Sequence, residues 1–149
     1  TEVVSLKKEI SLLEHYLNLQ SLLHGQKFTY TIVISPELDT EYITIPPMLA
    51  QPFIENAVEH GLKEINTGGL IEITFAQQEQ DLILEIIDNG KGIDPAEAKE
   101  HRSLATTITK ERIELYNKRN KANATFILTE AFPLNQNKGV KVSIVLPLT

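Results

Sequence analysis

The chain has 149 residues, of which 42% are hydrophobic and 23% charged, and its formal net charge is −6. These values indicate one globular domain with a buried core, and the scattered basic residues of an acidic chain argue against a nucleic-acid surface. The lack of cysteine excludes disulfides and thiolate metal sites, and no apolar run approaches the roughly 20 residues that span a bilayer.

The first half of the chain predicts two helices with a strand between them. Residues 4–23 carry apolar side chains at helical spacing and are followed by Gly25, which predicts an amphipathic helix. Because this pattern starts at once and no initiator Met precedes it, we expect the chain to be a fragment of a longer protein. Residues 28–34 alternate as a half-buried strand does, and residues 48–61 form a second helix between a Pro-Pro start and a Gly stop.

The second half predicts four strands and one long helix. Residues 89–106 hold two glycines and a proline with little apolar content, so we interpret them as a loop or lid, and residues 107–122 as a helix. The strands are expected at 70–76, 81–87, 125–129 and 138–146. Together the elements predict an α+β fold, a two-layer α/β sandwich with about five strands in a mixed sheet and three helices on one face.

Two polar side chains interrupt the apolar face of the predicted helix 48–61. On a wheel of about 100° per residue, Asn56 and His60 fall inside the apolar arc, close to Phe53. A buried amide without a partner costs about 1–3 kcal/mol, so each of these side chains needs a partner. That partner is either neighbouring backbone, which is the ordinary structural explanation, or a bound ligand.

Asp88 directly follows the apolar strand 81–87, so its carboxylate should lie at the edge of the core. A carboxylate there can accept a hydrogen bond from an exocyclic amine, such as the one on adenine. Gly90 and Gly92 lack side chains, which would let the backbone approach a flat ring closely. The alternative is an ordinary Asp-Asn-Gly turn, which is common in proteins.

The order of these motifs resembles that of the Bergerat-fold (GHKL) ATPases, a group that includes gyrase, MutL and the sensor histidine kinases. An Asn-bearing helix, a hairpin and then Asp-x-Gly-x-Gly-Ile follow one another in both. More narrowly, residues 46–62 closely resemble the N box of LytS-type sensor histidine kinases. Residues 13–28 resemble the helix and first strand leading into that catalytic domain, residues 109–115 its last-helix signature, and residues 139–147 its final glycine strand.

The resemblance implies that the chain binds ATP and Mg²⁺. Asn56 would hold the Mg²⁺ that bridges the phosphates, and Asp88 would bind the adenine amine. Three residues would shape the base pocket, and two further candidates would contact the nucleotide. The pocket residues are Gly90, Gly92 and Ile93, and the further candidates are His60 and Arg112. Arg112 shares a helix face with Ile108 and Leu115, so it should be partly buried beside an anion, either a phosphate or a nearby carboxylate.

The resemblance also implies a place in signalling. Residues 1–25 would be a linker helix leading from a dimerisation segment with the phosphoacceptor His, and residues 26–149 the ATP-binding catalytic domain. The intact protein would be a protein histidine kinase and a homodimer, transferring the γ-phosphoryl of ATP to that His for relay to a response regulator. This chain would be its cytoplasmic domain, in a bacterial kinase anchored in the inner membrane, and would be inactive alone.

Three departures from the family pattern stand out. Glu59 replaces the basic residue usual three positions after the N-box Asn, and we expect it to be solvated. Ala105, within residues 103–106, stands where the second glycine box of the family has its key glycine. The β-carbon of this alanine would narrow a phosphate loop. No phosphoacceptor motif is present, and His15 is better explained as solvated helix surface.

Two alternatives remain beside a working kinase domain. Ala105 and Glu59 would fit a catalytically degenerate nucleotide-sensing or scaffold module of the same fold. Another Bergerat ATPase, of the gyrase or MutL kind, would need a long lid and a transducer domain with a lysine reaching the γ-phosphate, which the sequence after residue 147 does not supply.

Overall fold

The computed structural model describes residues 3–93 and 103–148. Within this part of the chain, five strands form one mixed sheet in the order β2-β4-β5-β7-β6. β2 and β4 pair in parallel, and the other neighbours pair antiparallel. The strands are β2 (Phe28–Ile34), β4 (Gly69–Gln78), β5 (Asp81–Asp88), β6 (Thr125–Thr129) and β7 (Val140–Pro147). The predicted α+β class with a five-stranded mixed sheet is confirmed.

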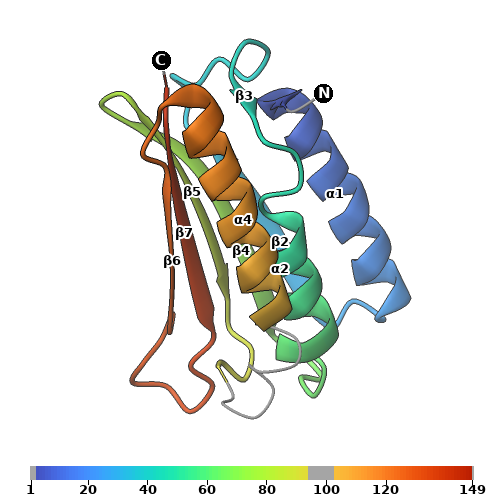
Figure 1. The fold of residues 1–149 in the computed structure, drawn as a ribbon. Helices are drawn as coiled ribbons and strands as arrows, with labels where there is room; N and C mark the ends of the chain where they lie inside the picture. The colour runs from blue at the N-terminus through green and yellow to red at the C-terminus, as the bar shows by residue number, and fades with distance from the viewer. Residues whose placement is uncertain (1–2, 94–102, 149) are drawn as a thin grey trace.

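The helices of the described residues cover one face of this sheet (Figure 1). A two-residue ladder of β1 (Val4–Ser5) and β3 (Thr44–Ile45) lies at the start of the first helix. The helices are α1 (Leu6–Leu23), α2 (Gln51–Asn56), its π-helical continuation η1 (Ala57–Gly61) and α4 (Ser103–Asn120). None of these helices combines the length and the apolar character that crossing a bilayer requires.

The core lies between the sheet and the helices. Strand side chains alternate between the two faces, so every second residue of β4, β5 and β7 points toward the helices. The nearly fully buried ones are Ile71, Ile73, Phe75, Leu82, Leu84, Ile86, Val142, Ile144 and Leu146. Each such side chain contributes about 1.5–3 kcal/mol through its burial.

α1 is part of the same core. Ser5 caps its first turn by accepting a hydrogen bond from the Lys8 backbone N–H at 3.2 Å. Its inward stripe, spaced three or four residues apart, is Leu6, Ile10, Leu13 and Leu17. α1 therefore packs as part of the helical layer of the domain, and the division of the chain into a linker helix over 1–25 and a domain over 26–149 stays a prediction.

α4 begins at Ser103, whereas the sequence predicted a loop up to residue 106. Ala105 is only 5% exposed in the first turns of this helix, where the high helix propensity of alanine suits it. Its β-carbon therefore packs inside the fold and does not narrow a loop at this position. The rest of the predicted lid, residues 94–102 with His101, lies outside the described residues.

Candidate functional site

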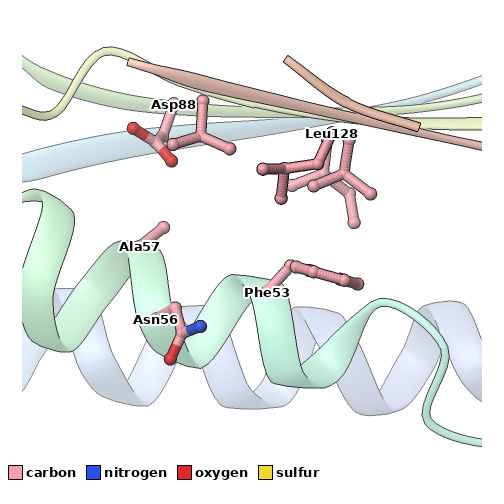
Figure 2. Close-up of a pocket in the computed structure, with 8 residues that line it drawn as sticks. Phe53, Asn56, Ala57, Asp88 and Leu128 are labelled. Atoms are coloured by element: carbon pink, nitrogen blue, oxygen red, sulfur yellow. The ribbon is translucent and has the colours of Figure 1, made fainter. Parts of the chain in front are cut away.

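Asn56 and Asp88, predicted to act together, line one small cavity between α2 and the sheet. Figure 2 shows Asp88 pointing from the sheet toward the helix, with Ala57 facing it and Asn56 on the side of the helix. The cavity has a volume of about 10 Å³, the space of about one water molecule. Its lining residues are Phe53, Asn56, Ala57, Ile86, Asp88, Leu128, Val140 and Val142.

The alternation of β5 places Asp88 on the buried face. Counting in twos from Leu82 through Leu84 and Ile86 reaches Asp88, which is 5% exposed at the end of the strand. Its Oδ1 accepts a hydrogen bond from the Gly90 backbone N–H at 2.9 Å. The carboxylate thus sits in an otherwise mainly apolar cavity, where an acceptor oxygen gives a bound molecule its orientation.

Gly90 is required by close packing of the loop on the end of η1. A β-carbon at residue 90 would clash with the backbone carbonyl of Gly61. The Lys91 backbone N–H also donates to that carbonyl oxygen, at 3.0 Å. The sequence suggested that Gly90 makes room for a ligand ring. The direction that a β-carbon would take is filled by the Gly61 backbone, and the contact of Gly90 with a ring stays a prediction.

Gly139 and Gly92 are two further glycines that pack closely around the loop after Asp88. Gly139 has a φ of +62°, and a β-carbon there would clash with the carbonyl oxygen of Asp88. Its N–H donates to the Gly90 carbonyl at 3.0 Å. Gly92 has a φ of +94°, and its missing β-carbon would lie 3.4 Å from the Gly139 backbone nitrogen. Protein backbone therefore surrounds Asp88 closely, and Ile93 packs half-buried against the core beyond it.

The helix that carries Asn56 changes form after this residue. The Leu62 N–H donates to the Ala57 carbonyl at 2.8 Å, five residues back, so the last turn is wider than the α-helix predicted through residue 61. The α-helical wheel therefore does not give the direction of the His60 side chain. This residue is half-buried. Glu59 is exposed, as expected. Such π-helical turns are frequent at functional sites.

Asn56 carries an unsatisfied polar atom. Its Nδ2 is buried and has no hydrogen-bond partner among the residues that the structure describes. An amide left in this state costs about 1–3 kcal/mol, and a bound water or a ligand group would remove that cost. Of the two partners that the sequence left open for Asn56, neighbouring backbone does not satisfy this atom.

The donor set suits a magnesium ion carried in with phosphates. No group of three or more His, Cys, Asp or Glu side chains that could hold a metal occurs among the described residues. Mg²⁺ commonly takes only one or two protein ligands and fills its other positions with phosphate oxygens and water. The side-chain oxygen of Asn56 would take that part, and its unpaired Nδ2 is a donor that would meet an acceptor such as a phosphate oxygen.

Arg112, a candidate nucleotide contact on α4, donates hydrogen bonds to the segment just before α2. Its Nη1 donates to the carbonyl of Met48 at 2.8 Å and to that of Pro47 at 3.4 Å. The guanidinium also attracts the carboxylate of Glu9, which is 3% exposed on α1. Of the two anions that the sequence left open for Arg112, the Glu9 carboxylate interacts with it, and the contact with a phosphate stays a prediction.

Burial raises the pKa of Glu9 above its ordinary value of 4.5, more than its hydrogen bond from Met48 and the Arg112 charge lower it. The folded chain therefore binds the proton more tightly than the unfolded chain. Lowering the pH from 7 toward 4.5 should stabilise the wild type relative to Glu9→Gln, which lacks this proton. Urea unfolding of both chains across this range measures the difference, and a constant difference would contradict the prediction.

The sequence did not identify the apolar walls of the cavity. Phe53 lies against Phe126 with ring centroids 5.9 Å apart, which brings α2 next to β6 at one end. Leu128 and Val140 come from strands whose alternation was predicted, but their approach to Asn56 depends on how the helix crosses the sheet. Gly139 was noted only as the start of the last strand, although a glycine before an alternating run is a signal for such close packing.

Residues 47–149 match a family model described as "Histidine kinase-, DNA gyrase B-, and HSP90-like ATPase". The sensor histidine kinase YpdA of Escherichia coli is 31% identical over 94 residues, covering 63% of this chain and 16% of that protein. The sensor protein LytS of Staphylococcus haemolyticus is 31% identical over 91 residues, covering 61% of this chain and 15% of that protein. The chain spans about a sixth of the length of these curated relatives.

Among solved structures, the mycobacterial sensor histidine kinase MprB is similar with a TM-score of 0.67 and 18% sequence identity. The match covers 98% of this chain and 96% of that one. At this identity the likeness shows the fold alone. The predicted resemblance to LytS-type sensor histidine kinases and to the wider ATPase group is confirmed by the family match and the curated relatives.

Proposed function

Because the chain belongs to the histidine kinase-, DNA gyrase B- and HSP90-like ATPase family, we propose that it binds ATP with Mg²⁺ between α2–η1 and the end of β5. The observation that carries the proposal is that one cavity is lined both by the buried acceptor Asp88 and by Asn56, whose Nδ2 donor is unpaired among the described residues. The cavity of about 10 Å³ has to widen before an adenine ring enters.

In the bound state each residue has one task. Asp88 accepts a hydrogen bond from the adenine amine, while the Gly90 N–H keeps its carboxylate in place. Asn56 holds the metal through its side-chain oxygen, and a bound Mg²⁺ neutralises phosphate charge. Ile93 borders the base, and His60 reaches the phosphates. These contacts position the nucleotide, and such positioning is the main contribution of protein to phosphoryl transfer.

The intact protein is proposed to be a sensor histidine kinase, as its curated relatives are named. The γ-phosphoryl passes to a His on a dimerisation segment outside residues 1–149, and from there to a response regulator, in a homodimer. His15 is exposed on the surface of α1, in keeping with a solvated residue rather than an acceptor. The cytoplasmic placement beneath an inner-membrane anchor stays a prediction.

Asn56→Ala tests the metal part of the proposal. The affinity of the wild type for ATP should rise when Mg²⁺ replaces EDTA, and we call the ratio of the two affinities the magnesium gain. The variant should lose this gain while keeping its affinity in EDTA. Without nucleotide the variant should be more stable by about 1 kcal/mol, because an unsatisfied amide is replaced by the best helix former. Calorimetric titration and urea unfolding measure the two quantities.

Gln51→Ala is the matched control, since it makes the same kind of change in the first turn of α2, away from the cavity. Its magnesium gain should equal that of the wild type. A magnesium gain in Asn56→Ala equal to that of the wild type would contradict the assignment of Asn56 as the metal ligand.

A further inference from the structure

Met48, three residues before α2, has both of its backbone polar groups bound by charged side chains from other helices. Its N–H donates to Oε2 of Glu9 on α1 at 3.0 Å. Its carbonyl accepts from Nη1 of Arg112 on α4 at 2.8 Å. Three helices of the domain thus meet at one peptide segment, and we call this arrangement of Glu9, Met48 and Arg112 the clasp.

The clasp holds Met48 in a conformation that it would otherwise avoid. Met48 has a φ of +64°, in the left-handed region that costs about 1–2 kcal/mol for a residue with a β-carbon. The residue is 40% exposed, so packing does little to hold it in place. Hydrogen bonds to charged groups contribute about 1.5–3 kcal/mol each, so Glu9 and Arg112 together offset the cost.

The clasp lies where α2 lacks a cap of its own. The N-cap residue Ala50 has no side-chain hydrogen bond to the first turn, so Pro52 in that turn is the local feature that favours the helix start. α2 has six residues and ends at Asn56. The helix continues without a break into η1, whose end accepts a hydrogen bond from the loop after β5. The position of Asn56 therefore depends on both ends of α2–η1, and the clasp acts at the first of them.

We propose that Glu9 and Arg112 are positioning residues for the nucleotide site, acting through the Met48 backbone to set the position of Asn56 at the cavity that Asp88 also lines. The inference rests on the proposed function. It means that a movement of α1 changes the metal-dependent part of ATP binding and leaves the contact of Asp88 with the base unchanged. Arg112 then acts on the nucleotide through Met48 and α2, without touching it.

The test compares the affinity for ATP in Mg²⁺ and in EDTA for Glu9→Ala, Arg112→Met and Glu9→Gln. The magnesium gain should fall about tenfold in the first two, within the usual range of coupling between sites, and the affinity in EDTA should change less than twofold. Glu9→Gln keeps an acceptor for the Met48 N–H and should fold normally, with a smaller fall. A general loss of structure would instead lower both affinities together.

Lys7→Ala is the matched control. Lys7 also lies on α1 and makes an exposed ion pair at 3.2 Å with Glu41, in the segment before β3, but it does not touch Met48. Its magnesium gain should match the wild type. A normal gain in all three clasp variants would overturn the clasp alone, whereas a wild type without any magnesium gain would overturn the proposed function and the clasp with it.

Discussion

Asp88→Asn is expected to abolish the stabilisation that ATP with Mg²⁺ gives this chain. A ligand at 100 times its dissociation constant adds about 2.7 kcal/mol, which raises the thermal midpoint of a domain of this size by roughly 5–10 °C. The amide has nearly the shape of the carboxylate but can present N–H donors to the adenine amine, itself a donor. The variant should therefore fold and show almost no shift on adding nucleotide.

The control is Asp81→Asn, the same substitution at the other end of β5, where the residue is half-buried and far along the strand from the cavity. Its shift with nucleotide should equal that of the wild type. An undiminished shift in Asp88→Asn would show that the base binds elsewhere. A wild type that does not shift at millimolar ATP would contradict nucleotide binding itself.

Gly139→Ala is expected to cause a large loss of stability in the chain without nucleotide. The new β-carbon would clash with the carbonyl oxygen of Asp88, which belongs to a paired strand and cannot move freely. The positive φ adds about 1–2 kcal/mol, so the total loss should reach about 3 kcal/mol, or roughly 6–12 °C in the thermal midpoint. Thermal unfolding of the variant and the wild type measures it.

Gly25→Ala separates the two causes. Gly25 has a φ of +64°, nearly that of Gly139, but a β-carbon there meets nothing within 4 Å. Its loss should be about 1–2 kcal/mol, from the backbone conformation alone. Equal losses at the two positions would mean that the contact with Asp88 carries no cost and that the site is less tightly packed than the structure shows.

The sheet and the position of Asp88 could be predicted because they depend on a local rule. Alternation over residues 81–87 fixes which side chains are buried, and one further step fixes Asp88. The pairing of Asp88 with Asn56 in one cavity came from the resemblance, because no local pattern says how a helix crosses a sheet. The structure supplied that crossing.

The parts that were not predicted depend on contacts between distant segments. No local pattern indicates that Met48 takes a positive φ, since that conformation is held by Glu9 and Arg112 from other helices. Glu9 itself could have been noticed, because it lies three residues after Leu6 and four before Leu13, inside the buried stripe of α1. The wide turn of η1 was missed because its composition equally suits an α-helix.

The sheet order has a consequence for how the domain assembles. β4 and β5 are neighbours in sequence and join through a tight turn between Gln78 and Asp81, so their pairing closes a very short loop. β2 reaches β4 only after a crossover of residues 35–68, whose closure costs more entropy and delays its pairing. Asn56 lies in that crossover and Asp88 in the early hairpin. The two halves of the nucleotide site therefore meet only when the crossover that carries Asn56 has packed on the hairpin that carries Asp88. Nucleotide then binds fully assembled molecules and stabilises them over partly folded ones.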